Sequence, residues 1–463
     1  MAVPELRAKH QILLRQAALI SAELDAWVAW TAKGSTLARN FSQIEALDYF
    51  MRRLCQSNER SVSALDPAGN ADVFLDNTLG LTANLIKFHA VWEFFRDRLE
   101  LRFVPLFQQS LLMADLVSYD CYRTITDRAD ALQIIPVQGF RGYPLIGLVT
   151  QFSPATWPRG WRPPALQNNC LPVPVIDLPW DHLANPWELL TIAHEVGHDV
   201  DEDLGKLTQA LQPAITDQMN RAKIPAARFV QWQKWTSEIL ADLVGVLLVG
   251  PAFVGALAGL LMLPRHYVRQ INLDDEHPPP YLRVFINTAL ARRLGLAQYA
   301  ADLERGWQAI YGEPGPNFSP YLADIEPVIS TILEAPLTAL RDQSGREHSL
   351  SDLIPFKPEH QEGIQDATAK LVAGGLPAGL PIRHVVSASQ LAFEHMVGGG
   401  NGGGLEGLAR RTRQAIVGLA PEPQLGGLAS QRVQRHLDDL AHTLLERPLE
   451  DLGIHFPVAK EGG

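Results

Sequence analysis

The sequence predicts a mainly α-helical protein with one small β element. Apolar residues recur at helical spacing toward both ends of the chain, while short β-rich runs are confined to one stretch before its middle. Of the 463 residues, 46% are hydrophobic and 20% are charged, a composition that can bury a large core. We divide the chain into a helical N-terminal region (1–130), a central core (131–302) and a helical C-terminal region (303–463).

Two amphipathic runs, residues 6–33 and 81–111, predict long helices in the N-terminal region. Turn-forming residues lie between them, in the segment Asp66-Pro-Ala-Gly-Asn70. We expect this region to form a helical cap or a surface for a partner protein.

The central core begins with two short β-rich runs, residues 145–150 and 173–177, separated by a loop rich in proline and tryptophan. A helix follows from about Pro186 to Asp203. Asn185 is a suitable N-cap, Pro186 suits the first helical position, and Glu188 would complete a capping box. Gly197 would allow a neighbouring element to approach this helix closely.

The predicted helix ends in an acidic run. We expect these carboxylates to form a solvated helix end, although one of them could supply a metal ligand. Because carboxylates oppose the dipole at a helix C-terminus, the helix either stops early or its acids meet a basic partner. The run comprises Asp199, Asp201, Glu202 and Asp203.

A second helix is predicted over residues 226–244, with Phe229, Trp232 and Ile239 on its buried side. Glu238 and Asp242 are the only charged residues between Lys234 and Arg265. A carboxylate in such apolar surroundings is costly unless it is paired or binds a metal.

The apolar stretch that follows, residues 243–263, is long enough to raise the question of a transmembrane helix. Gly250-Pro251 interrupts it in the middle, so we expect two buried helices that meet there and no membrane span.

The spacing of His194, Glu195 and His198 is typical of a catalytic zinc site. Residues four apart lie on one helix face, so the two imidazoles can bind a single ion. Catalytic zinc takes three protein ligands and leaves a position open for water. Glu238 can supply the third ligand, and Asp242, one turn further on, can accept the outer N–H of a ligand histidine.

These residues resemble the gluzincin zinc peptidases, whose HExxH and ExxxD motifs correspond here to HEVGH (194–198) and EILAD (238–242). The segment His277-Pro-Pro-Pro-Tyr-Leu-Arg283 is similar to the HPPxxxR segment of the HtpX and CAAX-processing peptidases. The resemblance covers residues 185–290 and implies one Zn²⁺ per chain. It implies that His194, His198 and Glu238 are the zinc ligands and that Glu195 is the general base. It also implies that Asp242 is the partner of a ligand histidine, that His277 contacts the oxyanion or the substrate, and that Arg283 braces the site.

The same resemblance implies a zincin-like metallopeptidase core and hydrolysis of peptide bonds, more by an endopeptidase than by an exopeptidase. In these peptidases a strand before the HExxH helix borders the active cleft and pairs with an extended substrate. The β-rich runs could have that role, or they could form a hairpin that merely supports the core. Both interpretations stay open.

The C-terminal region is predicted to be helical, including residues 320–340 and 428–445. Its glycine-rich segment, residues 398–404, lacks a following Lys-Ser/Thr pair and a clear preceding strand. We therefore expect a flexible connection and not a nucleotide site.

The net charge of −11 argues against a general affinity for nucleic acid. Cys55, Cys121 and Cys170 form no CxxC pattern, and the N-terminus lacks the apolar core of a secretion signal, so a cytoplasmic protein is expected. Its partners would be a protein or peptide substrate and a regulatory protein bound to the helical flanks, which could hold the enzyme latent. The alternative is a zinc-binding sensor or interaction module that retains a peptidase-like site.

Overall fold

The computed structural model describes residues 4–31, 36–134, 144–149, 173–399, 404–421 and 431–446. These residues are mainly helical, with two small two-stranded sheets, which confirms the predicted fold class. The chain forms two compact units. The first comprises Met1–Gln108, Thr150–Val175 and Pro421–Gly463, and the second comprises Gln109–Val149 and Ile176–Ala420.

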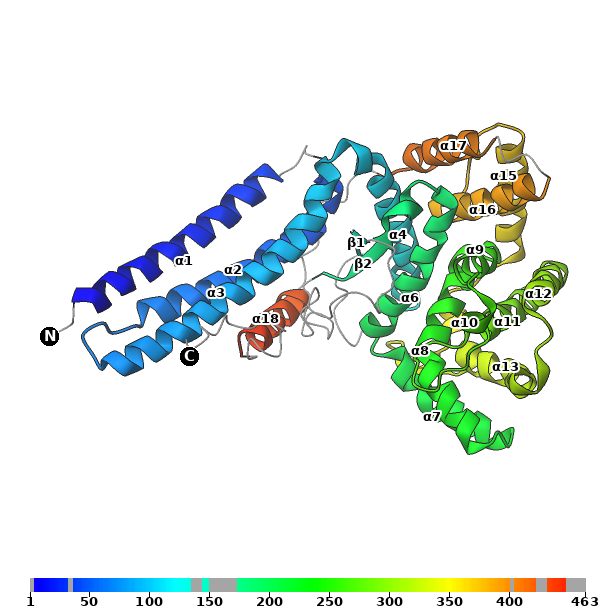
Figure 1. Cartoon of the computed structure of the whole chain (residues 1–463), viewed down its shortest axis with the longest axis horizontal. Helices are drawn as coiled ribbons and strands as arrows, with labels where there is room; N and C mark the ends of the chain where they lie inside the picture. The colour runs from blue at the N-terminus through cyan, green and yellow to red at the C-terminus, as the bar shows by residue number, and fades with distance from the viewer. Residues whose placement is uncertain are drawn as a thin grey trace, which may run out of the picture. The chain divides into compact units, whose positions relative to one another are not determined.

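The first unit contains three long helices that lie side by side (Figure 1), and the shorter helix α18 packs against α2 and α3. The Asn70 side chain caps α3 by accepting hydrogen bonds from the backbone amides of Asp72 and Val73, which confirms the turn predicted at 66–70. The helices are α1 (Pro4–Trp30), α2 (Phe41–Ser63), α3 (Ala71–Glu100) and α18 (Gln431–Glu446), with 3₁₀ turns η1 (Ala38–Asn40) and η2 (Leu101–Phe103).

The single helix expected over residues 81–111 is wrong, because α3 ends at Glu100 and a new helix, α4 (Pro105–Ala131), begins at Pro105. Proline disfavours a helical conformation of the residue before it. Accordingly, Val104 is extended, with φ −78° and ψ 115°.

The second unit contains the predicted β runs as a two-stranded sheet, followed by the helices that carry the candidate site. From Gln109 onward α4 also belongs to this unit. The elements up to residue 293 are β1 (Leu145–Val149), β2 (Val175–Pro179), η3 (Trp180–Leu183), η4 (Pro186–Thr191), α6 (Ile192–Asp203), α7 (Leu207–Arg221), α8 (Ala226–Val249), α9 (Ala252–Leu260), α10 (Arg265–Val268) and α11 (Pro280–Arg293).

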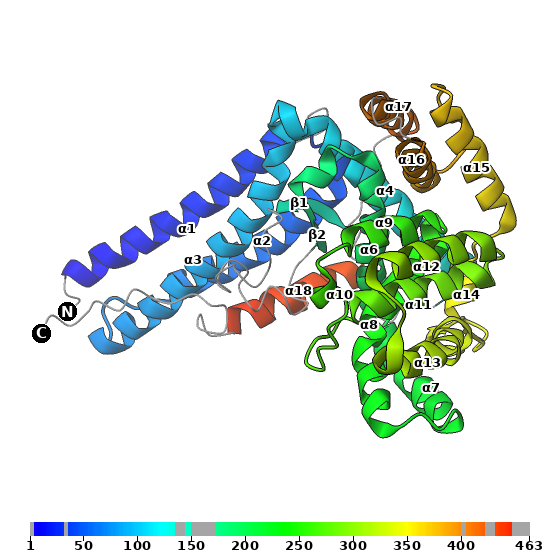
Figure 2. The ribbon, with the colours of Figure 1, turned by 45° about the vertical axis from the view of Figure 1, so that its right-hand side comes forward.

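The remaining elements of this unit form further helical layers, and α15, α16 and α17 lie together in Figure 2. Trp187 of η4 packs into the apolar core of these three helices. The elements are α12 (Ala297–Tyr311), α13 (Gly315–Glu334), β3 (Leu337–Arg341), β4 (Glu347–His348), α14 (Leu350–Leu353), α15 (Pro358–Val372), α16 (Ile382–Gly398) and α17 (Leu405–Gly418).

The helix expected from Pro186 to Asp203 begins as the 3₁₀ helix η4 and becomes α-helical only at Ile192. The predicted capping box is wrong. The backbone amide of Glu188 donates to the Asn185 carbonyl at 2.9 Å, as in a 3₁₀ turn, and the Asn185 side-chain amide donates to the Glu188 carboxylate. The Asn185 side chain therefore makes no capping hydrogen bond.

Helix α6 crosses α8 at Gly197, as the sequence predicts. A Cβ at this position would lie 2.8 Å from Ala241 Cα and 3.1 Å from the Ala241 carbonyl oxygen. Both are backbone atoms, which cannot give way as a flexible side chain can. Gly197 therefore sets how closely the two helices approach.

We expect Gly197→Ala to lower the free energy of unfolding by about 1–3 kcal/mol, because the added methyl group forces α6 away from α8. The matched control is Gly259→Ala in α9, where the added Cβ would meet nothing within 4 Å. That control should be neutral or stabilising by about 0.5–1 kcal/mol. Urea unfolding of both variants measures the difference, and equal midpoints would contradict the close-contact argument.

The apolar stretch after Asp242 forms two helices, α8 and α9, which separate at Gly250 with φ +78°. Arg383 and Ser387 of α16 donate to the terminal α8 carbonyls of Leu248 and Val249. The predicted pair of helices is confirmed, and within this stretch both are largely buried except at the end of α9, where Leu260 and the following Met262 and Leu263 are exposed. Within the described ranges, no helix has both the length and the apolar character needed to cross a membrane.

The helix predicted over residues 320–340 ends at Glu334, and residues 337–341 form strand β3, antiparallel to β4. Ala335 precedes Pro336 and is extended, with φ −63° and ψ 129°, so the helix stops there. Helix α18 confirms the helix predicted at 428–445. Three sequence features lie outside the described residues: the proline- and tryptophan-rich loop, Cys170, and residues 400–403 of the glycine-rich segment.

Candidate metal centre

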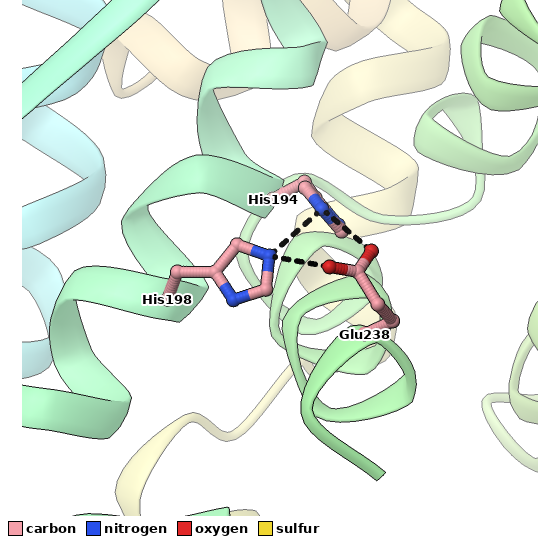
Figure 3. Close-up of side chains that lie close together, drawn as sticks. All are labelled: His194, His198 and Glu238. Atoms are coloured by element: carbon pink, nitrogen blue, oxygen red, sulfur yellow. Dashed lines mark hydrogen bonds and ion pairs between the residues drawn. The ribbon is translucent and has the colours of Figure 1, made fainter. Parts of the chain in front are cut away.

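Two packed helices bring His194, His198 and Glu238 together. His194 and His198 project from α6 and Glu238 from α8, and their polar atoms converge on one point (Figure 3). The Nε2 atoms of the two histidines are 3.2 Å apart. His198 Nε2 lies 3.3 Å from Glu238 Oε1, and His194 Nε2 lies 3.5 Å from Glu238 Oε2.

These spacings fit a single zinc ion. Two ligand atoms bonded to one tetrahedral ion at about 2.0–2.1 Å lie roughly 3.3 Å apart. In addition, Glu238 Oε2 is buried and accepts no well-formed hydrogen bond, although three side-chain nitrogens lie 3.3–3.5 Å away. A buried, unsatisfied carboxylate oxygen facing two imidazoles is suited to a cation, and nitrogen and oxygen donors are common zinc ligands.

Only these three side chains, among the residues that the structure describes, form a group with metal-ligand spacing. His198 is 31% exposed, whereas His194 and Glu238 are each 12% exposed. Three protein donors would leave one position of a tetrahedral ion available, as at catalytic zinc sites in general.

Glu195 follows His194 on α6 and is half-buried. Its carboxylate makes no hydrogen bond or ion pair with the part of the chain that the structure describes, and it does not belong to the ligand group. Its negative charge helps to raise the pKa of Arg283, which places it within electrostatic range of the centre. Glu195 is therefore available to hydrogen-bond water.

Asp242 is fully buried one turn after Glu238 on α8, and its Oδ1 lies 2.8 Å from His194 Nδ1. A carboxylate accepts hydrogen bonds, so this contact places a proton on Nδ1 and leaves Nε2 directed at Glu238. Burial would raise the pKa of Asp242, but Arg283 and His194 hold it well below its usual range.

Arg283, on the first turn of α11, makes two parallel hydrogen bonds to Asp242, each 2.8 Å long. Its Nη2 atom also lies 3.3 Å from Glu238 Oε2. Burial would lower the pKa of Arg283, but the charges of Asp242 and Glu238 raise it, so the guanidinium stays charged. The residue that the sequence predicts as a brace thus contacts both carboxylates of α8.

The electrostatic surroundings of His194 and Glu238 stabilise a positive charge between them. Burial alone would lower the pKa of His194, but the neighbouring carboxylates of Asp242 and Glu238 raise it to about 9. Burial would raise the pKa of Glu238, but the neighbouring His194 and His198 imidazoles and the charge of Arg283 hold it well below its usual range. The centre therefore stabilises a proton or another cation between these groups.

His277 lies at the same centre, on an exposed loop before α11. Its Nδ1 atom is 2.9 Å from Asp275 Oδ1, and its Nε2 atom is 3.4 Å from Glu238 Oε2. The side chain is 55% exposed, so it faces both the centre and solvent. No sequence signal indicated Asp275, whose position two residues before His277 lets its carboxylate orient the His277 ring.

The acidic end of α6 is not a solvated surface as predicted, because Asp201 and Asp203 are buried. Asp201 accepts hydrogen bonds from the Thr208 amide and hydroxyl at the start of α7, 2.7 and 2.6 Å long. Asp203 accepts one from the Tyr122 hydroxyl at 2.5 Å. Neither acid joins the metal-ligand group among the residues that the structure describes.

Comparison with known proteins gives no relative. No family model matches the chain, and no significant match is found among curated proteins or solved structures.

Proposed function

We propose that this protein is a zinc-dependent peptidase that hydrolyses peptide bonds. The observation that carries the proposal is the group of three ligand atoms at zinc spacing, with Glu195 next to His194 on α6 and paired with none of the residues that the structure describes. A zinc ion bound by His194, His198 and Glu238 supplies Lewis acidity toward water and toward the carbonyl oxygen of a substrate.

Glu195 is the proposed general base, since it can accept a proton from the attacking water and later deliver it to the leaving amine. His277, whose Nδ1 is held by Asp275 and whose Nε2 lies 3.4 Å from Glu238 Oε2, is the proposed contact for the developing oxyanion. Asp242 and Arg283 hold His194 and Glu238 in position.

The proposed substrates are proteins or peptides cleaved at internal bonds, and activity could be latent until the helical flanks bind a regulator. The proposed compartment is the cytoplasm. Cys55 and Cys121 are free and buried, as expected for structural cysteines that stay reduced.

The experiment that tests the proposal measures metal content and peptide cleavage of the purified protein. One zinc per chain with cleavage of a mixed peptide library would support a zinc peptidase. Zinc without cleavage, both in the full-length chain and after removal of a flank, would favour a metal-supported binding protein. A chain that binds no zinc would refute the proposal.

Glu238→Ala should lower zinc affinity by at least about 100-fold, because it removes one of three ligands. The matched control is Glu202→Ala, which removes a carboxylate from the acidic end of α6 and should leave the affinity unchanged. Competition with a chromophoric chelator measures both. Normal zinc affinity in Glu238→Ala would refute its role as a ligand, and a loss of affinity in Glu202→Ala would indicate a ligand in the acidic run.

A further inference from the structure

Asn287 is a buried polar side chain beside the proposed zinc centre, and none of the three motifs includes it. It lies on α11 one turn after Arg283 and is completely inaccessible to solvent. Its Nδ2 atom donates to Asp242 Oδ2 at 3.0 Å and to the Arg283 carbonyl at 2.9 Å. It therefore ties the backbone of α11 to the carboxylate that faces His194.

Asp242 has all its acceptor positions filled when Asn287 is included. A carboxylate offers about four lone-pair positions. Oδ1 receives His194 Nδ1 and Arg283 Nη2, both at 2.8 Å, while Oδ2 receives Arg283 Nε at 2.8 Å and Asn287 Nδ2 at 3.0 Å. With every position occupied, the carboxylate plane has one orientation, and His194 has a fixed partner.

Asn287 is also a poor choice for packing alone. Its Oδ1 atom is buried and accepts no hydrogen bond from the described part of the chain. A buried acceptor without a donor costs about 1–3 kcal/mol, and an apolar residue of the same shape would avoid that cost. The hydrogen bond from Asn287 Nδ2 to Asp242 therefore explains the presence of this amide better than a contribution to the stability of α11 does.

We propose that Asn287 is a positioning residue that fixes the Asp242 carboxylate and, through it, the His194 ring that binds zinc. This inference rests on the proposed function, because it assumes a metal at the His194, His198 and Glu238 group. Residues that orient metal ligands typically contribute about 10–100-fold to metal affinity. Asn287 acts on the orienting carboxylate and not on the ligand itself, so we expect an effect near the lower end of that range.

The test uses Asn287→Leu, which keeps the shape and removes the donor, with Asn58→Leu as a matched control. Asn58 is a buried asparagine within α2 of the other unit, with its own Oδ1 unsatisfied. Zinc affinity is measured by chelator competition, and the melting temperature of metal-free protein is measured in parallel. The visible absorption of cobalt-loaded protein reports the geometry of the ligands.

We expect Asn287→Leu to lower zinc affinity about tenfold and to alter the cobalt spectrum, while its metal-free melting temperature changes no more than that of Asn58→Leu. Unchanged zinc affinity and an unchanged cobalt spectrum would overturn the inference. If Asn287→Leu does not fold, the smaller change Asn287→Ser decides by the same readouts. Absence of zinc from the wild-type protein would instead refute the proposed function, so the two failures are distinguishable.

Discussion

Glu195→Gln is expected to lower kcat by about 10²–10⁴-fold while leaving zinc affinity unchanged. The amide has nearly the shape of the carboxylate but cannot accept the proton of the attacking water. Glu195 makes no hydrogen bond or ion pair with the residues that the structure describes, so its replacement breaks no protein contact there. Turnover of a peptide found in the library screen, together with zinc content, measures both effects.

Glu202→Gln is the matched control for this substitution. It lies seven residues later on α6, on the same side of the helix, and makes the same chemical change. We expect normal turnover from it. Full activity in Glu195→Gln would remove Glu195 from the mechanism, whereas a joint loss of zinc and activity would show that the variant disturbs the ligands.

The largest expected effect on stability is that of Arg283→Met. This change leaves the fully buried Asp242 carboxylate without its guanidinium partner, although His194 and Asn287 remain as donors. Removing one member of a buried ion pair costs about 3–5 kcal/mol, since the remaining charge stays desolvated. Urea unfolding of metal-free protein, with chelator present, measures this loss separately from any change in metal binding.

Arg228→Met provides the matched control, because Arg228 also makes two hydrogen bonds to a single carboxylate, that of Asp324. Arg228 is 24% exposed, and Trp232 Nε1 also donates to Asp324. The expected loss there is about 1–2 kcal/mol. A loss in Arg283→Met no larger than in this control would mean that Asp242 does not depend on Arg283 for its charge.

The predictions that the structure confirms rest on local signals. The turn at 66–70 and the break at Gly250 are encoded in a few adjacent residues whose backbone preferences are strong. The convergence of the HExxH and ExxxD residues follows from helical spacing together with the cost of burying Glu238 and Asp242 in an apolar stretch. The gluzincin resemblance itself stays a prediction.

The predictions that failed depend on contacts between distant segments. Residues 337–341 are mostly good helix formers by composition, and their pairing with β4 determines the strand. The acids at the end of α6 were predicted to be solvated because the residues that bind two of them, Thr208 and Tyr122, belong to other helices and are not evident from the local sequence. The 3₁₀ start at η4 likewise reflects a small difference in backbone energy that packing of Trp187 can decide.

Asn287 could have been suspected from its position one turn after Arg283, which places both on one side of α11. No sequence signal, however, indicates that this side faces Asp242, 45 residues earlier in the chain. Sequence patterns therefore do not predict the buried hydrogen bonds between helices that lie far apart in the chain.

The residues of the centre come from three helices, α6, α8 and α11, and this has a consequence for the order in which the chain folds. His194 and His198 belong to one short segment, but Arg283 meets Asp242 only after a loop of 41 residues has closed. Closing such a loop costs chain entropy that local helix formation does not repay. The pair of histidines can thus form early, whereas the complete centre matures late, when α11 docks against α8.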